Sequence, residues 1–264
     1  MTLKLGDVQT TALIPLAVKA NKTMRQNARI KDEIAVRIIK QLNVDTKSYD
    51  KFLSHEGVIA RTIMLDRMVR DFIAKNPTAV IVNVGAGFDN RFSRVDNGQI
   101  LWFDMDLPDV IAARKKVFDE QDRVVMMEGS ALDDGWCAAV KKEAEAKNIP
   151  LLFLAEGLFM YFTMEEIGKF FHILRGNFKT GTLIAEQNSP LMVKNEKLHD
   201  TVKATNAKFK SGTWSAEELL PLCEGIRLVE EHSFNEEMKK YSIRGKIFAL
   251  LFSKMNDRWA VFNW

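Results

Sequence analysis

The sequence predicts an α/β protein with a mostly parallel sheet and helices on both faces. Short β-branched apolar segments alternate along the chain with segments whose apolar residues recur at helical spacing. The first of the short segments, residues 79–84, is almost continuously apolar, as in strands buried on both faces of a parallel sheet. Strands that alternate with helices in this way are typical of right-handed βαβ units.

Helical patterns precede the first strand. Apolar residues keep helical spacing from Ile30 to Leu42 and again from Leu65 to Ile73, and Pro77 ends the second pattern. We therefore expect residues 1–76 to form a helical cap in front of the sheet.

Strands and helices then alternate. The further expected strands are residues 100–103, 123–127, 151–155, 182–185, 226–230 and 259–264. One expected helix begins at Pro108, and a second spans 134–146. A third begins at the capping box of Thr163 and Glu166, and a fourth lies near 236–253. Residues 190–224 are expected to be helical and more polar. Without repeats or linkers, the chain predicts one domain over 1–264, divided into the cap at 1–76, a core at 77–190 and a C-terminal part at 191–264.

The composition excludes several classes of protein. The 264 residues carry 38 Lys and Arg against 35 Asp and Glu, a net charge of +3 that does not indicate a nucleic-acid partner. The longest apolar run, residues 150–162, contains Glu156 and is shorter than the roughly 20 residues of a membrane helix. Since no signal peptide is recognisable, we expect a cytoplasmic protein without a membrane partner. Cys137 and Cys223 have neither disulfide-framework nor zinc-site spacing, so no metal is expected.

Gly85 and Gly87 follow the first buried strand. At the carboxyl end of a strand in an α/β sheet, glycines let a ligand approach the backbone, although a tight turn alone also favours glycine.

Asp104 and Asp106 lie 19 and 21 residues after Gly85, where an acid can accept hydrogen bonds from ribose hydroxyls. An alternative for Asp106 is capping of the next helix. Asn90 replaces the third glycine of the dinucleotide fingerprint, which favours a nucleoside ligand without phosphates over NAD or FAD.

Three further charged residues stand out against apolar surroundings. Glu156 ends an apolar run, so it must face a cleft or an ion-pair partner. Arg61 shares a helical face with Leu65 and therefore needs an anionic partner or access to water. Lys31 similarly shares a helical face with Ile34 and Ile38. Extension of its side chain into solvent is the alternative.

These motifs together resemble a known family, the class I S-adenosylmethionine-dependent O-methyltransferases of the leucine carboxyl methyltransferase type, in the branch of the tetracenomycin polyketide enzymes. The resemblance runs in order from about residue 10 to residue 190. It rests on four segments, residues 61–66, 82–92, 102–108 and 155–161.

The resemblance implies a Rossmann-like, seven-stranded sheet with an N-terminal helical lid, and a core that binds S-adenosylmethionine. It implies roles for individual residues: Arg61 on the methionyl carboxylate, Gly85 and Gly87 lining the cofactor, Asp106 on the ribose, Glu156 near the methionyl amine, Leu132 beside the adenine, and Lys31 reaching the carboxylate from the lid. Asp104 is a second candidate for the cofactor site. Tyr161 is a candidate for orienting the methyl acceptor, with aromatic packing as its alternative role.

The predicted function is methyl transfer from S-adenosylmethionine to a carboxylate or hydroxyl oxygen of a small molecule, with S-adenosylhomocysteine as product and without a metal. A carboxylate acceptor is already ionised at neutral pH and needs no general base. Two alternatives stay open: a non-catalytic S-adenosylmethionine-binding protein on the same scaffold, and a nicotinamide-dependent oxidoreductase. The sequence leaves the acceptor and the oligomeric state undetermined.

Overall fold

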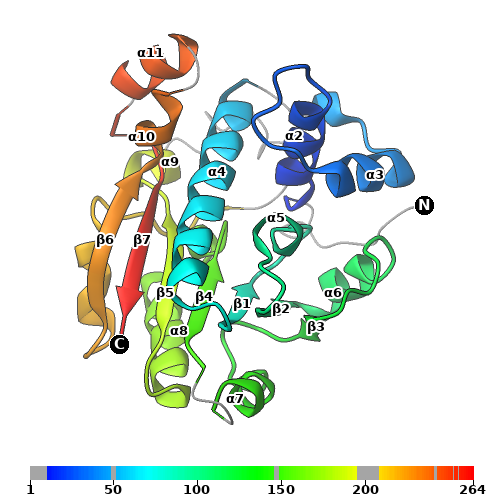
Figure 1. Ribbon diagram of the computed structural model, residues 1–264. Coiled ribbons are helices and arrows are strands. Elements are labelled where there is room, and N and C mark those ends of the chain that lie inside the picture. The colour runs from blue at the N-terminus through cyan, green and yellow to red at the C-terminus, as the bar shows by residue number, and fades with distance from the viewer. Residues whose placement is uncertain are drawn as a thin grey trace.

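One seven-stranded sheet forms the centre of the molecule (Figure 1). The computed structural model describes residues 11–48, 52–145, 149–194, 208–240, 243–251, 253–254 and 256–264. The strands are β1 (Val80–Val84), β2 (Leu101–Asp106), β3 (Val124–Glu128), β4 (Leu151–Ala155), β5 (Thr182–Gln187), β6 (Arg227–Ser233) and β7 (Arg258–Asn263). Their order is β3-β2-β1-β4-β5-β7-β6. The first five are parallel, whereas β7 runs antiparallel to both β5 and β6, which confirms the predicted mostly parallel, seven-stranded fold.

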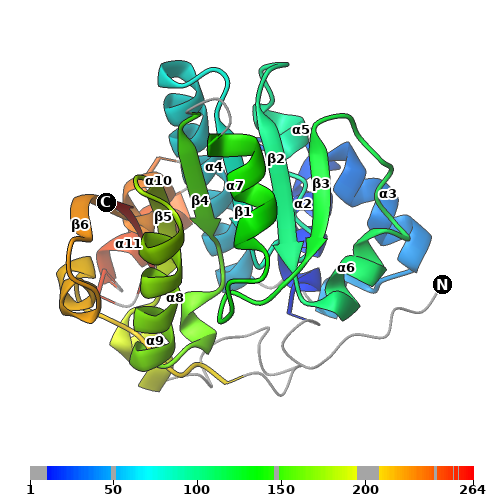
Figure 2. The same cartoon turned by 90° about the horizontal axis from the view of Figure 1, so that it is seen from below.

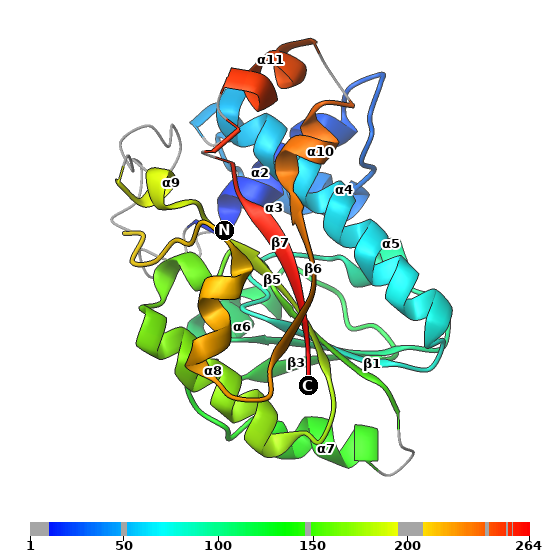
Figure 3. The same cartoon turned by 90° about the vertical axis from the view of Figure 1, so that its left-hand side faces the viewer.

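Helices cover both faces of the sheet (Figures 2 and 3). In chain order they are α2 (Leu13–Thr23), α3 (Glu33–Leu42), η1 (Thr46–Ser48), α4 (Phe52–Lys75), α5 (Phe92–Val95), α6 (Pro108–Arg114), α7 (Cys137–Glu145), η2 (Phe159–Tyr161), α8 (Met164–Asn177), α9 (Pro190–Lys194), η5 (Ala216–Leu222), α10 (Phe234–Met238) and α11 (Ile243–Leu251), where η marks 3₁₀ helices. Among the described helices, none is both long and apolar enough to cross a membrane.

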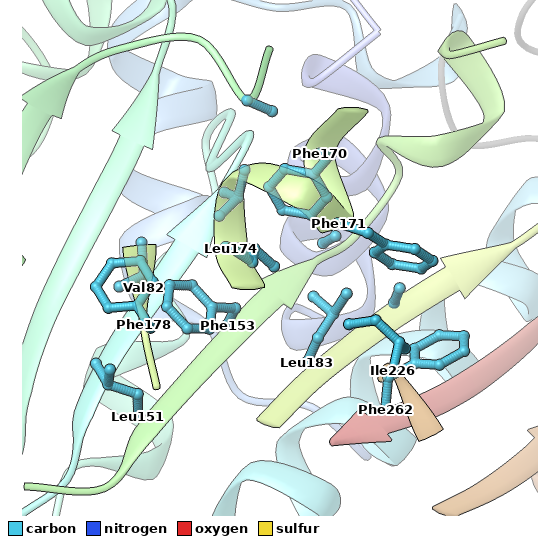
Figure 4. Close-up of a cluster of buried hydrophobic side chains, with 14 of the residues drawn as sticks. Val82, Leu151, Phe153, Phe170, Phe171, Leu174, Phe178, Leu183, Ile226 and Phe262 are labelled. Atoms are coloured by element: carbon cyan, nitrogen blue, oxygen red, sulfur yellow. The ribbon is translucent and has the colours of Figure 1, made fainter. Parts of the chain in front are cut away.

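Alternate residues of β1 explain why both faces need a covering layer. Val82 packs in the cluster that α7 and α8 share with the sheet, whereas Ile81 packs against Leu65 and Val69 of α4 on the opposite face. Successive side chains of a strand point to opposite faces, so a strand that is apolar at both must be buried on both. Figure 4 shows the first cluster, in which the rings of Phe153 and Phe178 lie 5.0 Å apart between their centroids.

Several elements begin or end elsewhere than the sequence predicts. The helix expected from Ile30 begins at Glu33, because the Asp32 carboxylate accepts a hydrogen bond from the Ala35 N–H at 2.8 Å and caps it. Lys31 consequently precedes the helix and is exposed. The single helix expected near 236–253 is divided into α10 and α11. Within 190–224, α9 and η5 are helical, and residues 195–207 lie outside the described residues.

The N-terminal segment contacts the carboxyl edge of the sheet. A Cβ atom built on Gly87, just after β1, would lie 3.0 Å from the Cβ of Ala12. From α2, the Lys19 ammonium lies 2.9 Å from Asp89 Oδ1 in the same loop. The cap is therefore held against the loop in which the sequence places the ligand site.

Candidate cofactor site

The turn after β1 has the backbone conformation that glycine allows. Gly85 has a φ of +71° and Gly87 a φ of +49°, both in the left-handed region. The Gly87 N–H donates a hydrogen bond of 2.7 Å to Asp106 Oδ2 at the end of β2. A hydrogen bond therefore joins the glycine turn to the end of the second strand at the carboxyl edge.

The two acids of β2 have different environments. Asp106 is half-buried and accepts hydrogen bonds only from the backbone N–H groups of Gly87 and Leu107 among the described residues. Its carboxylate does not cap α6, whose N-cap residue is Leu107, so the capping alternative is not observed. Burial raises the pKa of Asp106, and these N–H donors oppose the increase.

Asp104 is 3% exposed and points into the interior. Its carboxylate accepts hydrogen bonds from Asn83 Nδ2 at 3.1 Å and Trp102 Nε1 at 2.9 Å, and it pairs with the Arg114 guanidinium. Arg114 in turn donates to the carbonyl oxygens of Gly87 and Asp89 at 2.8 and 2.9 Å. Asp104 thus fixes the glycine turn through Arg114.

Arg61 and Glu156 meet at this edge. Arg61 Nε, from the middle of α4, lies 2.8 Å from Glu156 Oε1 at the end of β4, and both side chains are 13% exposed. Arg61 Nη1 also donates to Glu186 Oε2 of β5 at 3.1 Å. Burial disfavours the charged form of Arg61, but the carboxylates of Glu186 and Glu156 outweigh this effect and raise its pKa. The Arg61 Nε–H lacks an aligned hydrogen-bond acceptor among the described residues.

Arg91 forms the second ion pair of Glu156. Arg91 Nη2 donates to Glu156 Oε2 at 2.7 Å, and the Arg91 side chain is fully buried. Burial raises the pKa of Glu156, but Arg91 and Arg61 outweigh this effect and lower it. Glu156 therefore follows the end of its strand and takes part in two ion pairs, which is the ion-pair alternative that the sequence left open beside a cleft.

These contacts belong to one continuous ion network that joins the cap to the sheet. Each member lies within 4 Å of an oppositely charged member, and most are buried. The cations are Lys19, Arg61, Arg91 and Arg94, and the carboxylates are Asp32, Asp66, Asp89, Glu156 and Glu186. Carboxylates thus exceed cations by one within the network, and burial raises the pKa of one of them, Glu186.

Sequence reasoning singled out only Arg61 and Glu156 from this network. Asp89 and Arg91 directly follow the glycine turn, and charged residues just after a buried strand are a signal for a site. Glu186 stands near the end of an apolar strand, as Glu156 does, so the same pattern could have identified it. Lys19 and Asp32 belong to the cap and carry no comparable local signal.

The remaining predicted residues come from three other segments. Lys31 is exposed before α3, and Leu132 is half-buried in the loop after β3. Tyr161 lies in η2, where its hydroxyl donates to Thr11 Oγ1 at 3.3 Å and its ring centroid lies 5.8 Å from that of Phe209. Among the site residues predicted from the sequence, the structure brings Gly87 into contact with Asp106 and Arg61 into contact with Glu156.

Comparison with known proteins identifies the family of this chain. A family model described as leucine carboxyl methyltransferase matches residues 12–174. The chain is 25% identical over 234 residues to the tetracenomycin polyketide synthesis O-methyltransferase TcmP of Streptomyces glaucescens, covering 88% of this chain and 85% of TcmP. It is 24% identical over 191 residues to the S-adenosyl-L-methionine-dependent methyltransferase dpfgK of Gibberella zeae, covering 66% of this chain and 63% of dpfgK.

A solved structure shares the fold. The crystal structure of a DUF574 family protein from Streptomyces avermitilis superimposes with a TM-score of 0.56 at 12% identity, over 94% of this chain and 95% of that protein. At this level of identity, the similarity concerns the fold alone.

Proposed function

Because the chain belongs to the leucine carboxyl methyltransferase family of S-adenosylmethionine-dependent methyltransferases, we propose that it transfers the methyl group to an oxygen of a small molecule. The Streptomyces glaucescens relative is named an O-methyltransferase of polyketide synthesis, which supports an oxygen acceptor and a small substrate. The acceptor oxygen belongs to a carboxylate or a hydroxyl group.

The residues at the carboxyl edge fit the cofactor in our proposal. Gly85 and Gly87 place no side chain between the backbone and a ligand, and Asp106 keeps carboxylate lone pairs for ribose hydroxyls. Arg61, whose Nε–H lacks an aligned acceptor, pairs with the methionyl carboxylate, and Glu156 with the methionyl amine.

Three further residues complete the proposed cofactor site. Leu132 packs beside the adenine from the loop after β3, and Lys31 reaches the methionyl carboxylate from the cap. Asp104 acts indirectly, since it holds Arg114 and through it the glycine turn.

The network with its excess carboxylate is the observation that carries the proposal. When bound, S-adenosylmethionine supplies a methyl group activated by a positively charged sulfonium. The carboxylates of the network, above all Glu156, whose pKa is lowered by Arg91 and Arg61, stabilise such a cation at this edge of the sheet. The protein's remaining contribution is to align the acceptor with the methyl carbon and to exclude water. Tyr161, which anchors Thr11 of the N-terminal segment, orients the acceptor in this proposal.

Calorimetric titration of the purified protein with S-adenosylmethionine, S-adenosylhomocysteine and NAD tests this proposal. We expect both adenosyl ligands to bind and NAD to show no measurable heat of binding. Incubation with methyl-labelled S-adenosylmethionine and a panel of phenols and carboxylic acids should then transfer label to an oxygen. Binding of NAD alone would refute the cofactor assignment. Binding of S-adenosylmethionine with label transferred to nitrogen or carbon acceptors alone would refute the oxygen assignment.

A further inference from the structure

Large apolar side chains are exposed together on one face of α11. Ile243, Ile247, Leu250 and Leu251 are 78%, 52%, 75% and 68% exposed. Their spacing of three and four residues places them on the same side of a helix. Single apolar side chains scattered over a surface are ordinary, whereas a group of them on one helix face indicates an interaction site.

The opposite face of α11 is held against the protein by small residues. Gly245 is buried, and Ala249, about one turn further on, packs with Ala60 of α4 and Met238 of α10. A surface helix of a globular protein normally turns its large apolar residues inward and its polar residues to water. The arrangement in α11 is the reverse, so packing within the molecule does not account for its large apolar residues.

The segment that contains α11 is basic. Residues 239–254 include five Lys and Arg and no Asp or Glu. The exposed members are Lys239, Lys240, Lys246 and Lys254. Glu237, just before the segment, is 1% exposed and pairs with Arg67 and Lys240. The surface around the apolar face of α11 is therefore positively charged.

A second basic segment lies at the same end of the molecule. Residues 20–31 contain no Asp or Glu, and Arg25 and Arg29 are exposed in the loop after α2. Burial lowers the pKa of Arg29, and the carboxylates of Glu56 and of Glu237 on α10 oppose this effect, so the loop lies near α10. Figures 1 and 3 show this loop and α11 at one end of the protein. Cations of two segments thus share the end that carries the apolar face.

The size and charge of this face favour a lipid surface as its partner. A helix of nine residues rises about 14 Å, less than half the thickness of a bilayer core, so α11 can lie on a membrane but cannot span it. Basic helices with an apolar face bind at the interface of bilayers that contain anionic lipids. Two copies of this chain that met through α11 would instead bring like charges together.

We propose that α11 docks the protein onto an anionic lipid surface, with its four exposed apolar side chains among the acyl chains and Lys246 at the phosphate groups. The inference does not depend on the proposed function. It departs from the expectation of no membrane partner, which rested on the absence of an apolar run long enough to span a bilayer.

Docking through α11 also orients the sheet. The chain leads from α11 into β7, whose first residue, Arg258, pairs with Gln187 at the carboxyl end of β5. The docked face therefore lies at the edge of the sheet that carries the candidate cofactor site.

Sedimentation of the full-length protein with lipid vesicles tests this inference. One set of vesicles contains phosphatidylcholine and phosphatidylglycerol in equal parts, and the other contains phosphatidylcholine alone. The wild type should bind the mixed vesicles at least about tenfold more tightly, because several cations face the anionic headgroups. Its binding to the mixed vesicles should weaken as the NaCl concentration rises.

Substitutions on α11 separate the apolar contribution from the charge. Leu250→Glu should weaken binding to the mixed vesicles at least about tenfold, and Lys246→Glu about fivefold or more. Val229→Glu is the matched control, because Val229 is 56% exposed on β6, and this variant should bind as the wild type does. All three substitutions change exposed residues, so the melting temperatures should stay close to that of the wild type.

Three results would overturn the inference: no binding to either kind of vesicle, equal binding to both, or unchanged binding of Leu250→Glu. The first result would leave the face to an acidic protein partner. Sedimentation velocity without lipid detects another occupant, since a dimer that Leu250→Glu dissociates would assign the face to a second copy of the chain. Titration with S-adenosylhomocysteine tests the proposed function separately, and Leu250→Glu should bind this ligand as the wild type does.

Discussion

Arg61 Nε on α4 lies 2.8 Å from Glu156 Oε1 at the end of β4, so a helix that precedes the sheet meets its fourth strand in one ion pair. The same guanidinium reaches Glu186 of β5, a residue 125 positions away in the sequence. The Arg61 guanidinium therefore links acids at the carboxyl ends of two adjacent strands. A ligand carboxylate that binds this guanidinium must share it with Glu156 and Glu186.

Replacement of this arginine should affect binding more than any other single change on α4. Arg61→Ala removes a charge-assisted partner of the ligand carboxylate, worth about 1.5–3 kcal/mol, so the calorimetric Kd for S-adenosylhomocysteine should rise at least about tenfold. Arg70→Ala is the control, because Arg70 is exposed on the same helix and donates to the Arg94 carbonyl. Equal affinities of the two variants would remove Arg61 from the site.

Substitution of the two acids of β2 should affect different properties, ligand binding for Asp106 and stability for Asp104. Asp106→Asn should weaken S-adenosylhomocysteine binding by about 1.5–3 kcal/mol with little change in stability, because Asp106 keeps its place at the ligand edge. Asp104→Asn should instead lower the free energy of unfolding by about 3–5 kcal/mol, because it leaves the buried Arg114 without its carboxylate. Urea unfolding and calorimetry on both variants provide the comparison, and a reversed pattern would contradict these assignments.

The ion network should contribute to stability through its buried members. Arg91→Met leaves three carboxylates without this cation, Asp66, Asp89 and Glu156, and should lower the free energy of unfolding by about 3–5 kcal/mol. Arg37→Met removes an exposed pair with Asp119 and should change it by less than about 1 kcal/mol. Chemical denaturation of both variants measures the difference, and a loss of similar size in the two would contradict a stabilising network.

The glycine turn should not tolerate a side chain. Gly87→Ala places a Cβ on a residue with a φ of +49° and 3.0 Å from the Ala12 Cβ, so we expect a loss of about 1–2 kcal/mol of stability and weaker cofactor binding. Gly176→Ala in α8 is the matched control, since its Cβ would meet no atom within 4 Å. This substitution should stabilise the protein by about 0.4–1 kcal/mol. If Gly87→Ala proved as stable as the control, the turn would not require glycine.

Asp257 should make stability depend on pH. Burial, reinforced by the nearby Glu186, raises the pKa of Asp257 to about 8. In the unfolded chain an aspartate has a pKa of about 3.9. Between these values the folded state binds more protons than the unfolded state, so this group should make stability fall as pH rises from about 4 to 8.

Asp257→Asn removes that titration and should flatten this part of the stability curve, with its largest relative gain above pH 8. Thermal unfolding of both proteins across this range measures the effect. An identical pH dependence of wild type and variant would show that Asp257 ionises normally.

The sequence by itself determined the layers and the position of the proposed ligand edge. The two-sided apolar pattern of β1 required helices on both faces, and Gly85, Gly87 and Asp106 marked the edge by their places at the ends of two strands. These features are local, because strand periodicity, turn conformation and the end of an apolar run depend on neighbouring residues. Errors of boundary, such as the helix start at Glu33, arose from a cap that competes with the apolar pattern.

Only the tertiary structure decided which charges meet. The pairing of Arg61 with Glu186, of Arg91 with Asp66 and of Asp104 with Arg114 follows from strand order and from the docking of the cap, which no local pattern specifies. The difference between Asp104 and Asp106 has the same origin. Both residues lie on the same face of β2, but Asp104 lies within the strand, where Arg114 of α6 pairs with it, whereas Asp106 is the last residue of the strand and lies at the edge.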